Sequence, residues 1–135
     1  MKNPKAFEEE KHLLNNPEMD ELHKEFLDIY NSANLDSMKS IKEKLTLLML
    51  HSKKHFSYEE SLMDEYGYPT HKEHKEEHNK VLAEVQYFLN LSQSSFGQKM
   101  MKAYYTEKIP SWFDLHLISM DSDLAYFLKQ KGYAC

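Results

Sequence analysis

Residues 51–78 read HSKKHFSYEESLMDEYGYPTHKEHKEEH and hold five of the eight histidines in the chain. Within this stretch His55 and Glu59 are four residues apart, as are His74 and His78. Side chains at this spacing share one face of a helix and lie about 6 Å apart along its axis. The tripeptide GYP between the two pairs is expected to end one helix before the next begins. The stretch therefore predicts a helical hairpin that directs two pairs of metal-binding side chains toward one point.

Composition restricts the class of protein. The chain has 135 residues, 41% of them hydrophobic, which fits a single domain with one packed core. It has no apolar run near the ~20 residues that a membrane-spanning helix needs, and its acidic, polar N-terminus does not resemble a signal peptide. All 17 basic residues are lysines and the net charge is −5, which disfavours nucleic-acid binding. The single cysteine, Cys135, excludes an internal disulfide and favours a reducing compartment, most simply the cytoplasm.

Capping signals and apolar periodicity predict four helices. Asn16, which precedes a proline, is expected to open the first helix. Asp36 is the expected N-cap of the second helix, and Thr70 begins a capping-box pattern, T-x-x-E, at the start of the third. The fourth helix is expected to begin near Gln98, with Pro110 kinking or restarting it.

Four helices with short connections predict an all-α protein, an up-down-up-down four-helix bundle with a short N-terminal arm. We expect the arm at residues 1–16, the bundle at residues 17–131 and a C-terminal tail at residues 132–135. The sequence shows no internal repeat and no linker to a second domain. It also contains no feature that identifies a protein partner.

Candidate metal ligands on all four helices fall at one depth in such a bundle. Counted from the end where the first helix begins, they lie in a slab roughly 5–20 Å inward. Any one histidine could instead be a core-edge or surface residue, but surface residues have no reason to share a depth. The candidate ligands are His23, His55, Glu59, His74, His78, His116 and Asp121.

The kinds of ligand select the metal. Seven ligands are too many for one tetrahedral zinc, and calcium or magnesium would prefer oxygen to imidazole. Two carboxylates that bridge, five terminal imidazoles and an oxo or hydroxo bridge fill all but one coordination position of two octahedral ions. His116 and Asp121 are five residues apart, which places them about 140° apart around an α-helix. We therefore expect these two residues to flank a site wide enough for two ions, most plausibly iron, rather than to point at one atom.

Several motifs together resemble those of the hemerythrin family, in its bacterial single-domain form, over roughly residues 19–128. The motifs are Asp20-x-x-His23-Lys24, His55-Phe56-x-x-Glu59-Glu60-x-x-Met63, Tyr68-Pro69, His74-x-x-x-His78 and Trp112-x-x-x-His116-x-x-x-x-Asp121. The resemblance implies a non-heme di-iron site that binds O2 reversibly. It implies that three histidines hold one iron and two hold the other, with both carboxylates bridging. These groups would be His74, His78 and His116 on one iron, His23 and His55 on the other, and Glu59 and Asp121 between them.

The resemblance and the ligand count favour an O2 carrier, storage or delivery protein rather than an enzyme. The open coordination position is expected on the iron held by two histidines, in an apolar pocket. Its expected walls are Phe26, Phe56, Trp112 and Phe113. Phe113 stands where an aliphatic residue is commoner in the family.

Two other functions remain open. The chain could sense O2 or redox state through a partner, or it could be a di-iron oxidase or peroxidase. Ferritin-type di-iron bundles use two Glu-x-x-His motifs. Only Glu9-x-x-His12 fits that pattern here, and it lies in the expected arm. An ordinary helical bundle with surface histidines is the remaining alternative.

Overall fold

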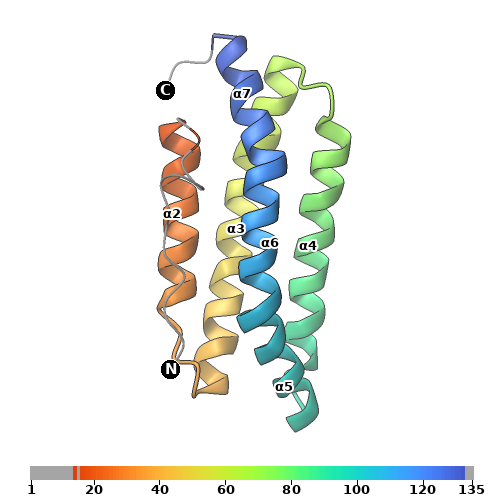
Figure 1. Ribbon diagram of the computed structural model, residues 1–135. Coiled ribbons are helices and arrows are strands. Elements are labelled where there is room, and N and C mark those ends of the chain that lie inside the picture. The colour runs from red at the N-terminus through yellow and green to blue at the C-terminus, as the bar shows by residue number, and fades with distance from the viewer. Residues whose placement is uncertain (1–13, 15, 133–135) are drawn as a thin grey trace.

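The computed structural model describes residue 14 and residues 16–132, and this part of the chain is helical with no strand. Neighbouring helices run antiparallel, which confirms the four-helix bundle (Figure 1). The helices are α2 (Pro17–Asn31), α3 (Met38–Tyr66), α4 (His71–Leu91) and a fourth built of α5 (Ser95–Ala103), η1 (Tyr104–Lys108), α6 (Ile109–His116), η2 (Leu117–Asp121) and α7 (Ser122–Gln130). Most of the expected arm and the last three residues of the expected tail lie outside the described residues.

The starts of the first two helices show one correct and one wrong expectation. Asn16 caps α2, because its side chain accepts a hydrogen bond from the backbone N–H three residues later, at 3.1 Å. Ser37 rather than Asp36 caps α3 in the same way, at 3.1 Å. The backbone N–H of Asp36 is bonded to the side chain of Asn34 at 3.0 Å, so Asp36 belongs to the turn before the helix.

The starts of the last two helices also differ from expectation. Thr70 precedes α4 but makes no side-chain capping bond, so the expected capping box is wrong. Its φ of −103° and ψ of 30° lie outside the extended region from which a cap side chain reaches back to the helix. The fourth helix begins at Ser95, three residues earlier than Gln98, and the side chain of its N-cap Ser94 accepts from the N–H of Gly97 at 2.9 Å.

Two wide turns of π-helix interrupt the fourth helix, and neither was expected. The first, η1, ends one residue before the proline-containing start of α6, where the N–H of Ile109 bonds to the carbonyl of Tyr104. A proline inside an α-helix removes one hydrogen bond and clashes with the preceding turn. The wider turn before Pro110 relieves that clash, so the helix continues past the proline instead of stopping.

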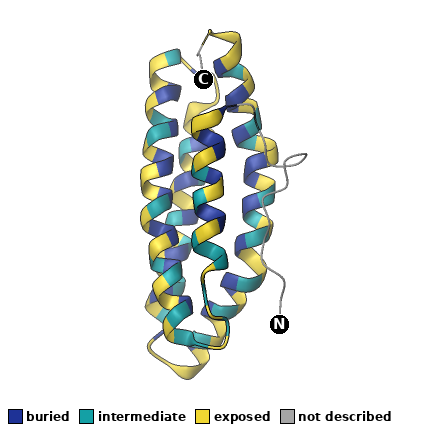
Figure 2. Ribbon diagram, turned by 90° about the vertical axis from the view of Figure 1, so that its left-hand side faces the viewer, coloured by how far each residue is buried: buried dark blue, intermediate teal, exposed yellow. Residues whose placement is uncertain are grey.

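The core consists of two apolar clusters, and the candidate ligands lie between them on every helix. The larger cluster includes Phe26, Ile41, Leu45, Leu48, Val85, Tyr105 and Leu117. The smaller one contains Met19, Leu62, Met63, Tyr68, Leu124, Ala125 and Leu128. Buried residues follow the inner face of each helix, as Figure 2 shows. Apolar packing on both sides therefore supports a polar slab at the depth predicted from the sequence.

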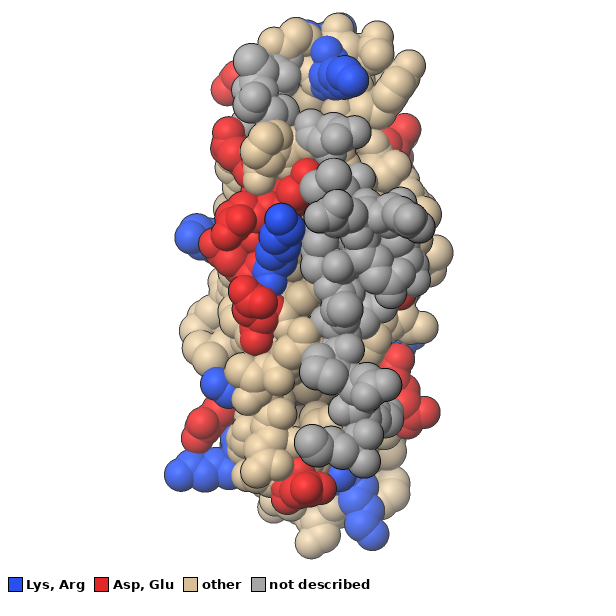
Figure 3. Space-filling model, turned by 60° about the vertical axis from the view of Figure 1, so that its left-hand side comes forward, with Lys and Arg blue, Asp and Glu red and all other residues tan. Residues whose placement is uncertain are grey.

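Charged side chains of both signs lie on the surface of the bundle. On the face drawn in Figure 3, lysines are scattered among acidic side chains and form no continuous basic strip. Such a strip is what contacts to nucleic-acid phosphates would require. Among the described helices, none combines the length and the apolar character needed to cross a membrane.

Candidate metal centre

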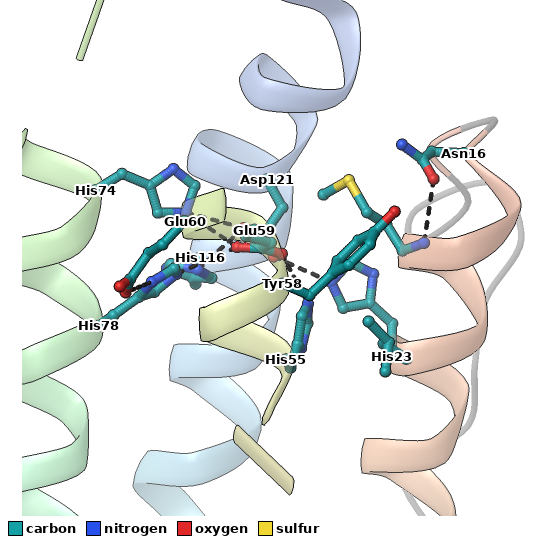
Figure 4. A network of polar contacts seen from close by, with 12 residues as sticks. Asn16, His23, His55, Tyr58, Glu59, Glu60, His74, His78, His116 and Asp121 are labelled. Carbon is teal, nitrogen blue, oxygen red and sulfur yellow. Dashed lines mark hydrogen bonds and ion pairs between the residues drawn. The ribbon is translucent and has the colours of Figure 1, made fainter. Parts of the chain in front are cut away.

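All seven predicted side chains converge in the slab between the two apolar clusters (Figure 4). They come from all four helices: His23 from α2, His55 and Glu59 from α3, His74 and His78 from α4, and His116 and Asp121 from the fourth helix. None of the seven is more than 5% exposed. Five imidazoles and two carboxylates are thus withdrawn from water together, which requires compensation by bound cations or protons.

Glu59 contacts three imidazoles from two helices. Its Oε2 lies 2.7 Å from Nε2 of His55, one turn away on the same helix. Its Oε1 lies 3.3 Å from Nε2 of His74 and 3.2 Å from Nε2 of His78. The i, i+4 spacings within residues 51–78 therefore do what the sequence predicted, because both pairs reach one carboxylate.

Asp121 contacts three imidazoles from three helices. Its Oδ2 lies 3.0 Å from Nε2 of His23. Its Oδ1 lies 3.2 Å from Nε2 of His74 and 3.0 Å from Nε2 of His116. Each carboxylate thus presents one oxygen to a histidine of α2 or α3 and its other oxygen to two histidines of the opposite side, both from α4 for Glu59, and one each from α4 and the fourth helix for Asp121.

The close approach of His116 and Asp121 corrects the expectation of 140° between them. That angle assumed an α-helix, whereas the second π-helical turn, η2, begins directly after His116 and ends at Asp121. The N–H of Ser122 bonds to the carbonyl of Leu117, five residues back, which marks the wider turn. Residues five apart share a face of a π-helix, so both side chains point into the same site.

The donor atoms form two overlapping groups. One contains Glu59, His74, His78, His116 and Asp121, and the other contains His23, His55, Glu59 and Asp121. Within each group the donor atoms lie within 4.8 Å of one another. The two carboxylates belong to both groups, which is the arrangement expected where two ions share bridging acids.

The hydrogen-bonding state of these atoms tests whether the residues fit a metal. Several histidine Nε2 atoms lie 3.0–3.3 Å from a carboxylate oxygen. These atom pairs nevertheless form no proper hydrogen bonds within the described part of the chain. The unbonded atoms include Oε1 of Glu59, Oδ1 of Asp121 and Nε2 of His74, His78 and His116. Buried polar atoms are seldom left unpaired. Lone pairs that approach one another without bonding are aimed at a common point, as ligands of an ion are, so the donor set fits a metal centre.

The electrostatics of the site favour bound cations. Burial and the charge of Asp121 oppose ionisation of Glu59, but His55 and His74 outweigh them and hold the pKa of Glu59 below its ordinary value. Burial also opposes ionisation of Asp121, but the imidazoles around it, His116 foremost, hold its pKa well below its ordinary value. Burial alone would lower the pKa of His74, but the two carboxylates that face its ring, Asp121 and Glu59, raise the pKa to about 9. Both acids are therefore ionised near neutral pH, and a metal that binds there displaces protons.

A small cavity of about 10 Å³ adjoins the site and is lined by His23 and His55 and also by His116 and Asp121. Its lining includes all four aromatic residues expected from the sequence, together with Ser52. The aromatic residues are Phe26, Phe56, Trp112 and Phe113. Ser52, which is 7% exposed, was not among the pocket walls expected from the sequence. Its position one turn before His55 on the same helix face was the available signal.

Aromatic rings also hold the histidines of the other side. The indole of Trp112 stacks on the ring of His116, with centroids 4.8 Å apart and planes 18° apart. Its Nε1–H donates to Oε1 of Glu77 at 3.2 Å, which fixes the indole against α4. Sequence reasoning placed Trp112 in a motif but did not identify Glu77, because no spacing rule connects two helices.

Comparisons with known proteins gave one match. No family model matches the chain, and no solved structure matches it significantly. The chain is similar to a protein named Bacteriohemerythrin from Campylobacter jejuni, with 28% identity over 127 residues. The similar region covers 87% of this chain and 91% of that protein. The similarity and the buried cluster of histidine, glutamate and aspartate side chains together fit a di-iron site.

Proposed function

The similarity to a bacteriohemerythrin over most of both chains supports a hemerythrin-family assignment, and on that premise we propose that this protein binds O2 reversibly at a pair of iron ions. It would act as an oxygen carrier, store or delivery protein rather than as an enzyme. A cytoplasmic location is part of the same proposal and depends on the single cysteine alone.

We propose that the two overlapping groups of donor atoms each hold one iron. His74, His78 and His116 would bind one iron, and His23 and His55 would bind the other. Both carboxylates would bridge, since each contacts histidines of both groups. The side with two histidines then has fewer protein ligands, which leaves room there for a small molecule. The ions would supply the electrons that O2 takes up on binding and returns on release.

The observation that carries the proposal is the position of the cavity. It touches both histidines of the two-histidine side, but only His116 of the other three, and its volume of about 10 Å³ is close to the roughly 10–15 Å³ that one water needs. Four aromatic rings line it, so it favours a small neutral molecule over water or an anion. Exclusion of water and protons by these rings would slow irreversible oxidation of the site.

A spectroscopic experiment tests the function. The protein is loaded with Fe(II) without air, and its metal content is measured; we expect about two iron ions per chain. Exposure to air should produce visible charge-transfer bands, and removal of O2 should abolish them. A protein that stays colourless in air would contradict the proposal. Sustained turnover of peroxide or of a quinol would instead support a di-iron enzyme.

A pair of histidine variants tests the ligand set. His74→Ala removes a buried imidazole that contacts both carboxylates, so it should lose much of its iron. His71→Ala is the matched control, because His71 is exposed at the start of the same helix. Equal iron loss in the two variants would show that His74 is not a ligand.

A further inference from the structure

Glu60 lies beside the site without belonging to the donor set. Its Oε2 is 3.0 Å from Nδ1 of His78, as the close-up in Figure 4 shows. The side chain of His78 is 0% exposed, whereas that of Glu60 is 29% exposed. Glu60 therefore connects the inaccessible edge of a proposed ligand to the surface of the bundle.

The contact with Glu60 assigns separate tasks to the two nitrogens of His78. Nε2 faces Oε1 of Glu59 at 3.2 Å, on the side of the site. Nδ1 faces a carboxylate, which can only accept, so Nδ1 must carry the proton. A neutral imidazole with its proton on Nδ1 has a free lone pair on Nε2, which is the form that binds a metal.

The ring of His78 is also held across its face. The phenyl ring of Phe56 stacks on it with centroids 3.8 Å apart and planes 3° apart. Stacking fixes the plane of the imidazole but does not distinguish its two nitrogens. The hydrogen bond to Glu60 supplies that distinction, so the two contacts have different roles.

Three of the other four histidines of the site differ in this respect. Nδ1 of His23, His74 and His116 has no hydrogen-bond partner among the described residues. A carboxylate on Nδ1 makes an imidazole a stronger electron donor to a metal bound at Nε2. His78 is therefore set apart electronically from these three histidines.

We propose that Glu60 is a positioning residue that fixes His78 as an Nε2 ligand and strengthens its donation to the metal. The inference rests on the proposed function only for the identity of the metal as iron. Removal of the acceptor with Glu60→Ala should speed the loss of iron to a chelator roughly 10-fold or more, the usual scale for a partner of a metal-bound histidine. Glu60→Gln keeps an acceptor oxygen without the charge, so it should remain within about threefold of the unaltered protein while its reduction potential rises.

The matched controls are Glu76→Ala and Glu76→Gln. Glu76 is an exposed carboxylate on α4, two residues before His78, and its replacement changes the net charge equally. Both controls should keep their iron and their potential. If Glu76→Ala loses iron as fast as Glu60→Ala, the effect comes from the change in net charge alone, and the inference is overturned.

A second readout uses the iron-free protein. Because the His78 ring is fully buried, its Nδ1–H should exchange slowly with water and be visible by nitrogen-edited NMR while Glu60 accepts it. The resonance should persist in Glu60→Gln and disappear in Glu60→Ala. Its persistence in Glu60→Ala, or iron retention equal to that of the unaltered protein, would overturn the inference.

The outcomes separate this inference from the proposed function. A protein that holds iron and fails to bind O2, but loses iron faster as Glu60→Ala, would contradict the function and support the role of Glu60. If the unaltered protein and Glu60→Ala bind O2 equally well and hold iron equally tightly, the result would support the proposed function and contradict the role of Glu60.

Discussion

Phe113 is one of the aromatic residues that line the cavity, and its replacement by leucine provides a sharp test of the structure. The ring is 4% exposed and lines the cavity of about 10 Å³. It stacks on Phe26 with centroids 5.0 Å apart and planes 18° apart. Its edge meets the ring of His23 at 5.9 Å and 90°. Leucine at this position keeps the apolar character but removes both ring contacts and part of the volume.

The expected magnitude follows from these contacts. A stacked aromatic pair contributes about 0.5–1.5 kcal/mol beyond its area, and unfilled volume costs about 24 cal/mol per Å³. The free energy of unfolding of Phe113→Leu should therefore fall by about 1–3 kcal/mol. Because the cavity already lies near the lower limit for one water, the added space should admit water. The lifetime of the O2 complex should then shorten severalfold.

The assay combines urea denaturation with the decay of the visible bands of the O2 complex. Phe88→Leu is the control, because Phe88 stacks on Tyr104 at 4.2 Å and does not line the cavity. It should lower stability to a similar degree and leave the lifetime unchanged. An unchanged lifetime in Phe113→Leu, or an equal loss in Phe88→Leu, would refute the link between cavity volume and oxidation.

Three further predictions concern the bundle. Gly67 ends α3 at φ 68°, and an added Cβ would meet nothing within 4 Å. Gly67→Ala should therefore lower the free energy of unfolding, measured by urea denaturation, by about 1–2 kcal/mol through backbone strain alone, and a loss near zero would contradict this. Burial raises the pKa of Tyr30 to about 12, so the contribution of its neutral hydroxyl to stability is complete below pH ~10 and is lost as the pH rises toward 12. A phenolate titration should therefore show a step at high pH that Tyr30→Phe removes, and the absence of that step would contradict the prediction. Removal of iron with a chelator should lower the thermal midpoint, since binding to the folded form alone stabilises it, and an unchanged midpoint would exclude a metal held by the native site.

The apolar periodicity of the sequence predicted most of the fold. The common depth of the candidate ligands in the bundle predicted that the seven side chains lie together. This worked because burial imposes one repeat on every helix, so positions such as His55 and Glu59 can be placed without a structure. Contacts between helices are different, because nothing in the spacing of one helix locates Glu60 against His78. The prediction of a capping box at Thr70 was also wrong, because the backbone conformation there, and not only the residue type, decides whether a side-chain cap forms.

The second π-helical turn, η2, was not predicted from the sequence. Its presence bears on whether the metal centre can tolerate a chain of different length between His116 and Asp121. Asp121 follows His116 at a spacing of five residues, whereas an α-helix would need a spacing of four to place both side chains on one face. Ile118 and Ser119, in the middle of that turn, lie on the outer side of the bundle. A chain one residue shorter at that turn would reach the same geometry through an ordinary α-turn. Homologous proteins with either spacing can therefore share one centre, and sequence alignments that forbid a gap there would misplace the aspartate.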